Sequence, residues 1–144
     1  MAYRILFNKV FVALINASLE PYLGYVHTTK WGTRSLVYDF MEIYRYLADG
    51  FLIGYCRKLK DDDFILKPDY LDPSKKGKRH FLNNKKNKEF LAKIEEYFQS
   101  YVPIRRIRMG RKQRIETLIR EEAMLLAAFL RCEKKAWIPR VVAL

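Results

Sequence analysis

Residues 35–56 read SLVYDFMEIYRYLADGFLIGYC, and this stretch decides the fold class. Its apolar side chains recur every three or four residues, at positions 36, 37, 40, 44, 47, 51 and 55. That spacing is typical of an α-helix with one face in a core, because residues three and four apart share a helix face. Ser35 or Thr33 would cap the first turn. We therefore predict one long helix from about Ser35 to Cys56.

Three further stretches carry helical patterns. The first, from Tyr3 to about Ser18, is apolar on nearly all sides, which is typical of a helix buried against others. The other two run from about Lys86 to Ser100 and from about Arg111 to Lys134. The last of them has an apolar stripe in which Glu122 is the only polar member. With only six Gly and five Pro in 144 residues, we predict an all-α fold. It would be a compact bundle of about four to six helices in a single domain, residues 1–144.

A different composition begins at Arg57, where helical periodicity stops. Lys75 to Lys88 holds seven Lys and Arg and no acidic residue, and His80 lies within it. We predict a flexible basic insertion here, with His80 a solvated member of it. The only hint of a strand is Phe81-Leu82.

Net charge indicates the kind of partner. Twenty-eight Lys and Arg against sixteen Asp and Glu give a net charge of +12, which attracts polyanions. A second acid-free cluster lies ahead of the last helix and comprises Arg105, Arg106, Arg108, Arg111, Lys112 and Arg114. Two such clusters with aromatic residues nearby favour contact with nucleic-acid backbones. A membrane is a weaker candidate, because the apolar stretch from Ile5 to Leu19 is interrupted by polar residues and is too short to span one.

The cysteines and the N-terminal stretch indicate a compartment. Cys56 and Cys132 lie far apart, with no metal-ligand spacing. Arg4 and Lys9 sit inside the first apolar segment, whereas a signal peptide has its charges ahead of it. We therefore expect reduced thiols and a cytoplasmic protein.

His27, Asp39 and Glu42 are the candidates for chemistry. His27 follows the turn at Gly24 and precedes the helix on which Asp39 and Glu42 are three residues apart, hence on one face. One imidazole and two carboxylates suit a divalent cation, with Mg²⁺ or Mn²⁺ favoured by the oxygen ligands. The same residues also have structural explanations, since acids stabilise helix N-termini and a lone His is often hydrogen-bonded.

Two blocks around these residues resemble a known family. Glu20 to His27, EPYLGYVH, is similar to the "dPylGflH" signature of the CRISPR-associated integrase, which inserts new spacers into CRISPR arrays. Ser35 to Arg45, SLVYDFMEIYR, is similar to that family's "sLvlDlmEefR" helix. The opening Tyr3 to Phe7 resembles the family's "YgYaLLY" helix, and the end of the chain through Pro139 resembles its C-terminal helix. The resemblance covers nearly the whole chain.

That resemblance implies a set of roles. His27 and Glu42 match two ligands of a divalent metal, Mg²⁺ or Mn²⁺, and Asp39 matches the acid that supports them. These three would form the catalytic site. Lys30, Tyr38 and Arg45 fall near family positions that contact DNA. Together with Arg34 and, from the second basic cluster, Arg105, Arg106 and Arg108, they are the residues that we expect to bind DNA.

The resemblance also implies a larger protein. The family's third ligand, a Glu on an upstream helix, has no counterpart in this sequence, nor does its N-terminal β domain. We therefore expect the C-terminal helical domain of a metal-dependent DNA endonuclease and integrase of antiviral defence, weak or inactive by itself. Its expected partners are double-stranded or branched DNA, the small second adaptation protein of the CRISPR system, and a second copy in the full-length protein.

Two alternatives stay open on the sequence. A non-catalytic basic helical module would bind DNA or RNA through the two clusters alone. An assembly domain would instead dock a partner through the first helix.

Overall fold

The computed structural model describes residues 1–28, 31–68, 78–103 and 112–142. Within these ranges five α-helices follow one another along the chain: α1 (Ala2–Asn16), α2 (Ser35–Glu42), α3 (Arg45–Cys56), α4 (Asn84–Gln99) and α5 (Ile115–Leu130). A short 3₁₀ turn and four strands complete the described elements: η1 (Asp61–Asp63), β1 (Phe64–Pro68), β2 (Lys78–Leu82), β3 (Tyr101–Pro103) and β4 (Lys112–Arg114).

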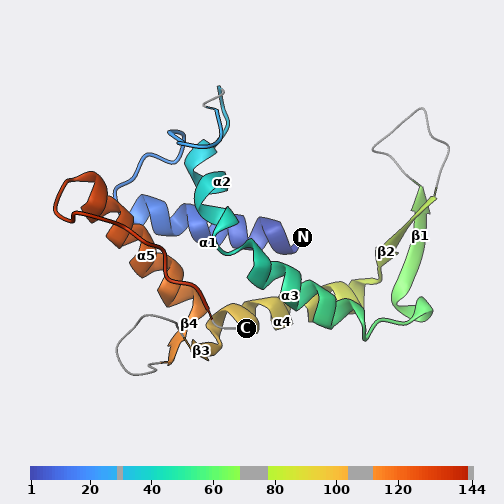
Figure 1. Cartoon of the computed structure of the whole chain (residues 1–144). Helices are drawn as coiled ribbons and strands as arrows, with labels where there is room; N and C mark the ends of the chain where they lie inside the picture. Colours follow the sequence, from blue (N-terminus) through green and yellow to red (C-terminus); the bar gives the residue numbers. More distant parts are fainter. Residues whose placement is uncertain (29–30, 69–77, 104–111, 143–144) are drawn as a thin grey trace.

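The strands make the prediction of an all-α fold wrong. They form two separate two-stranded antiparallel sheets, so the fold is mixed, with helices predominating. In the first sheet Phe64 pairs with Leu82 and Pro68 with Lys78, and this hairpin projects beyond the ends of α3 and α4 (Figure 1). In the second, Tyr101 pairs with Arg114. Each strand is short and mostly exposed, so the burial that normally marks a strand in sequence is weak here.

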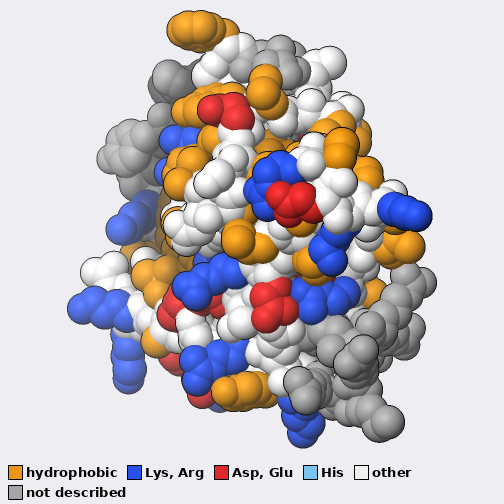
Figure 2. Space-filling view, turned by 90° about the vertical axis from the view of Figure 1, so that its left-hand side faces the viewer, with side chains coloured by type: hydrophobic (Ala, Val, Ile, Leu, Met, Phe, Trp, Pro, Cys, Tyr) orange, Lys and Arg blue, Asp and Glu red, His pale blue; other side chains and the backbone are white. Residues whose placement is uncertain are grey.

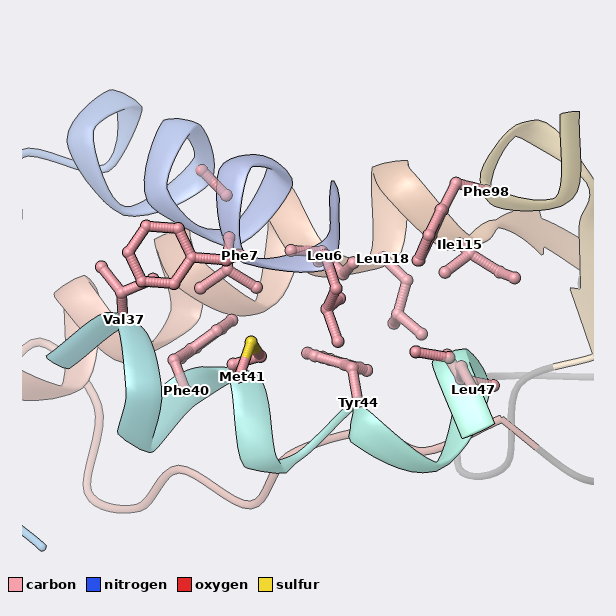
Figure 3. Close-up of a cluster of buried hydrophobic side chains, with 14 of the residues drawn as sticks. Leu6, Phe7, Val37, Phe40, Met41, Tyr44, Leu47, Phe98, Ile115 and Leu118 are labelled. Atoms are coloured by element: carbon pink, nitrogen blue, oxygen red, sulfur yellow. The ribbon is translucent and has the colours of Figure 1, made fainter. Parts of the chain in front are cut away.

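Helix α1 forms the centre of the molecule. Helices α2, α3 and α5 all contact α1 (Figure 1). These contacts explain why its residues are apolar on most sides. Figure 3 shows Leu6 and Phe7 of α1 facing side chains of α2 and α3, beside Phe98 of α4. Lys9, also on α1, pairs with Glu95 of α4 at 2.6 Å and with Glu116 of α5 at 3.0 Å. Leu6, Val10 and Leu14 are fully buried, whereas Val12 and Ile15 are 53% and 48% exposed, so the predicted burial holds for one face of this helix only.

The long helix predicted over residues 35–56 is two helices. The helix breaks at Ile43 and Tyr44, where Tyr44 adopts φ −117° and ψ 4°. Tyr44 is fully buried, and the bend lets Phe40 of α2 and Leu47 of α3 both reach the core against α1 (Figure 3). The apolar spacing continues across residues 43 and 44, so the sequence pattern does not mark this break.

Helix ends differ from the sequence prediction in detail. Arg34 occupies the N-cap of α2, where no side chain caps, so the predicted caps Ser35 and Thr33 do not serve. Asn83 caps α4, its side chain accepting from the Lys86 amide at 2.8 Å. Cys56 and Cys132 are both free and exposed. No helix among the described ranges is long and apolar enough to cross a membrane.

The packing of the core predicts different effects on stability for substitutions at two nearby positions of α4. Ile94 is fully buried and Leu91 is 42% exposed. We expect Ile94→Ala to lower the free energy of unfolding by about 2–5 kcal/mol, because it opens a cavity. Leu91→Ala should change it by about 0.5 kcal/mol or less. Urea unfolding followed by circular dichroism measures both, and equal losses would contradict the described packing of α4.

Candidate active site

A loop, residues 20–28, folds over the start of α2. The Leu36 amide donates to the Pro21 carbonyl at 3.1 Å, and the Ser35 hydroxyl donates to the Thr28 carbonyl at 3.2 Å. Both donors belong to the first turn of α2. The amides of a first turn have no hydrogen-bond partner inside the helix, so the bond from Leu36 satisfies one of them. The loop is therefore held at both ends by α2, and we call it the histidine loop because it carries His27.

The Asp39 carboxylate organises the histidine loop between those two points. Its Oδ2 accepts from the amides of Tyr25 at 2.6 Å and Val26 at 3.0 Å. Its Oδ1 accepts from the His27 amide at 2.9 Å and lies 2.5 Å from the His27 Nδ1. The Asp39 side chain thus accepts hydrogen bonds from three consecutive loop amides, which have no partner in a strand or helix.

This geometry decides the charge of Asp39. Burial alone would raise the pKa of its carboxyl group, since only 3% of the side chain is exposed. The hydrogen bonds from Val26, His27 and Tyr25 outweigh burial and lower the pKa below its ordinary value. Burial and the nearby carboxylate raise the pKa of Tyr25 to about 12, so its phenol stays neutral.

The same contact fixes the tautomer of His27. An ionised carboxylate only accepts hydrogen bonds, so the Nδ1 beside it carries the proton. In the neutral form of the ring the other nitrogen, Nε2, carries the lone pair, and 47% of the side chain is exposed. A carboxylate–histidine pair of this kind is how proteins orient an imidazole for a metal ion or a proton.

Gly24 allows the loop to lie this close. A Cβ added at Gly24 would be 2.7 Å from Asp39 Oδ2, 2.7 Å from the Ser35 Cβ and 2.9 Å from the His27 carbonyl oxygen. Any larger residue would push the loop off the carboxylate. The sequence pattern identified Gly24 only as a turn, and its contact with Asp39 and the Ser35 bond were not predicted.

Glu42 lies one helical turn beyond Asp39 and has different surroundings. Its carboxylate is 45% exposed and pairs with Arg45 at 2.8 Å. The Arg45 guanidinium also lies over the Tyr3 ring, 4.9 Å from its centroid, and the Tyr3 hydroxyl donates to Asp49. Although their spacing puts Asp39 and Glu42 on one face of the helix, they do not present a pair of carboxylates to solvent, because Asp39 is turned to the loop.

The ligand set is therefore partial. No group of three or more His, Cys, Asp and Glu side chains that could hold a metal ion occurs among the described residues. His27 offers one free nitrogen, and Glu42 offers oxygens that Arg45 now neutralises. These two donor types suit a divalent cation, but they supply fewer ligands than one requires.

Three of the residues predicted to bind DNA are among the described residues, and two of them, Tyr38 and Arg45, contact His27 or Glu42. Tyr38 has its ring centroid 5.9 Å from that of His27 and is 39% exposed. Arg34 lies over Phe11, 4.5 Å from the ring centroid, and Arg45 pairs with Glu42. The other predicted residues, Lys30, Arg105, Arg106 and Arg108, lie outside the described residues.

Figure 2 shows one face of the molecule, where Lys and Arg side chains lie among Asp and Glu side chains. The Lys and Arg side chains drawn on this face are thus interspersed with acidic ones. A net charge of +12 does not by itself place a binding surface there.

Comparison with solved structures indicates the class of protein to which this fold belongs. The structure of a casposase bound to an integration product superimposes with a TM-score of 0.75 at 19% identity, over 94% of this chain and 35% of that one. A Cas6-RT-Cas1–Cas2 complex gives a TM-score of 0.73 at 19% identity, over 94% of this chain and 14% of that one. The fold is thus one that casposases and Cas1 proteins share.

The sequence profile of the family "CRISPR associated protein Cas1" matches residues 1–96, and the chain belongs to that family. A CRISPR-associated endonuclease Cas1 of Korarchaeum cryptofilum is 26% identical over 141 residues, 98% of this chain and 36% of its own length. The chain thus spans about a third of that relative. The resemblance read from the two sequence blocks is confirmed.

The surroundings of Gly24 and Gly50 predict opposite effects on stability when each glycine is replaced by alanine. Gly24→Ala should lower the free energy of unfolding by about 1–3 kcal/mol, because its Cβ overlaps Asp39 and the His27 carbonyl. Gly50→Ala, inside α3 with open space around it, should raise it by about 0.5–1 kcal/mol. Urea unfolding of the two variants measures this. A Gly24→Ala chain as stable as the parent would show that the loop does not lie where described.

The lowered pKa of Asp39 predicts a pH dependence. The ionised form stabilises the folded chain, and that contribution is complete above the ordinary carboxyl pKa of about 4 and is lost as the pH falls through the lowered folded value. We expect Asp39→Asn to be less stable by about 2 kcal/mol at neutral pH, with the difference shrinking in acid. Urea unfolding at pH 7 and pH 3 tests this, with exposed Asp62→Asn as the control. A difference that does not change with pH would contradict the assigned role of Asp39.

Proposed function

We propose that this chain contributes two ligands, His27 and Glu42, to the site of a metal-dependent DNA integrase and endonuclease of CRISPR adaptation. The observation that carries the proposal is the Asp39 carboxylate, which holds the His27 ring by Nδ1 and leaves Nε2 free beside a helix that bears Glu42. Membership of the Cas1 family supports it, since matched relatives are named as endonucleases.

We assign a separate role to each residue of the site. His27 Nε2 and the Glu42 oxygens would hold Mg²⁺ or Mn²⁺, and a bound divalent cation supplies Lewis-acid activation of a phosphodiester. Asp39 is a positioning residue, because its oxygens are occupied by the loop amides and the imidazole. Arg45 would have to release Glu42 before that carboxylate could bind a cation, and it would then be free for a phosphate.

DNA and protein partners follow from the same family. The solved relatives include a casposase bound to an integration product and a complex that contains Cas2. We propose double-stranded or branched DNA as the substrate, reached by Arg34, Tyr38 and Arg45, with Lys30, Arg105, Arg106 and Arg108 as further contacts. Cas2, the small second adaptation protein, and a second copy of the full-length protein are the proposed partners.

A third ligand has to come from elsewhere. The family resemblance implies an upstream Glu as this ligand, and no third His, Cys, Asp or Glu joins His27 and Glu42 among the described residues. We therefore expect the 144-residue chain to bind a cation weakly and to cut branched DNA weakly or not at all. Robust cutting by this chain alone would contradict the incomplete ligand set.

Paramagnetic Mn²⁺ tests the proposed ligands without requiring catalysis. The chain has two histidines, His27 and, on β2, His80, whose ring packs against Phe64. We expect Mn²⁺ to broaden the NMR signals of the His27 ring at concentrations that leave His80 sharp, because Asp39 holds the His27 Nδ1 and lies one helical turn from Glu42. Glu42→Gln should abolish the selectivity, whereas Glu96→Gln, an exposed acid on α4, should not. Equal broadening of both histidines would contradict the site.

One observation favours a second candidate, an assembly role for α1. Val12 and Ile15 on α1 are 53% and 48% exposed, and a cavity of about 670 Å³ lies between α1 and α5 beside Met124. Of the residues that line this cavity Met124 is 54% exposed, and exposed apolar side chains on neighbouring helices are typical of a docking surface. Sedimentation of the chain over a range of concentrations, with and without DNA, separates the two candidates, since only assembly through α1 is independent of DNA.

A further inference from the structure

The segment after the last helix ties three elements together. Residues 131–142, which we call the C-terminal segment, turn back at the end of α5 and run beside it (Figure 1). The Cas1 profile ends at residue 96, well before this segment. Its described contacts reach α5, α2 and the start of α3.

A buried acid on α5 anchors the segment. Glu122 is fully buried, and its carboxylate accepts from Arg140 Nε and, at 3.0 Å, from Trp137 Nε1. Arg140 also donates to Glu121 at 3.1 Å. A charge without solvent has to be neutralised and hydrogen-bonded in place, so Glu122 fixes both of its donors. This explains the one acid in the apolar stripe of the last helix.

From this anchor the segment reaches α2. The Trp137 ring stacks on Phe40 with centroids 6.0 Å apart and planes 8° from parallel. Phe40 is buried and directly follows Asp39 in α2. At the start of α3, the Val142 amide donates to the Tyr46 hydroxyl at 2.9 Å. Helix α2 is thus held by α1 on one side and by Trp137 on another.

We propose that Trp137, fixed by Glu122 and Arg140, is a positioning residue for His27. The chain of contacts runs from Glu122 to the Trp137 ring, to Phe40, and through the neighbouring Asp39 to the amides and imidazole of the histidine loop. Without the ring, Phe40 loses its stacked partner in the C-terminal segment, and the first turns of α2 are freer to shift on α1. Asp39 would then no longer meet the three amides and Nδ1 together. The inference rests on the proposed function in one respect, namely that His27 is a functional residue.

The test uses the 144-residue chain without metal or DNA. Long-range ¹H–¹⁵N NMR reports which ring nitrogen of His27 is protonated, and hydrogen exchange reports the amides of Tyr25, Val26 and His27. In Trp137→Leu, we expect the fixed Nδ1–H form to give way to a tautomer mixture, and the three amides to exchange about ten-fold faster than in the parent. Trp137→Phe keeps a flat ring on Phe40 and should restore most of both signals.

Two further variants keep the test decisive. Ile94→Val loosens the α4 core by a small amount and should leave the His27 tautomer and the loop amides unchanged. Glu122→Gln removes the charge that holds Arg140 and should reproduce the effect of Trp137→Leu, so it replaces that variant if Trp137→Leu does not fold. A parent-like His27 in Trp137→Leu or Glu122→Gln, or the same change in Ile94→Val, would overturn the inference. Either outcome leaves the Mn²⁺ test untouched, so the two proposals fail separately.

Discussion

The Asp39 carboxylate is the interaction on which the site depends. It is nearly inaccessible to solvent yet ionised, because three backbone amides and an imidazole donate to it. That single group sets the path of the histidine loop, the tautomer of His27 and the requirement for glycine at position 24. Without it, the loop amides would have no partner and His27 would have no fixed orientation.

The rest of the fold keeps Asp39 where this is possible. Helix α2 lies on the central α1 through Val37, Phe40 and Met41 (Figure 3), and the bend at Tyr44 lets α3 continue on the same helix. Behind Phe40, the C-terminal segment closes the other side through Trp137. Two carboxylates therefore act at opposite ends of one series of contacts, Glu122 as an anchor in the core and Asp39 as an organiser at the surface.

The sequence predicted the helices better than the links between them. Apolar periodicity located α1, α4 and α5 within a few residues, since each has a face in the core. Of the two sheets the sequence indicated only Phe81-Leu82, which lies in β2, because the strands are short and mostly exposed and no alternation of buried side chains marks them. The bend at Tyr44 was missed because Tyr44 keeps the helical spacing although its backbone does not.

For the site, residue types and spacing selected His27, Asp39 and Glu42 but not their different roles. The i, i+3 spacing places Asp39 and Glu42 on one face, yet only the fold shows that Asp39 faces the loop while Glu42 pairs with Arg45. The lone Glu122 in an apolar stripe was a signal of a buried ion pair. Its partners lie 15 and 18 residues away in an irregular segment, where no periodicity points to them.

The tautomer of His27 in the parent chain is the most direct test of the role given to Asp39. A long-range ¹H–¹⁵N spectrum at a pH where the imidazoles are neutral reports both ring nitrogens, with His80 as the internal reference. We expect His27 to carry its proton on Nδ1 alone, with an unprotonated Nε2, while His80 shows a mixture of the two forms. A His27 protonated on Nε2, or a mixture like that of His80, would contradict the carboxylate–histidine pair.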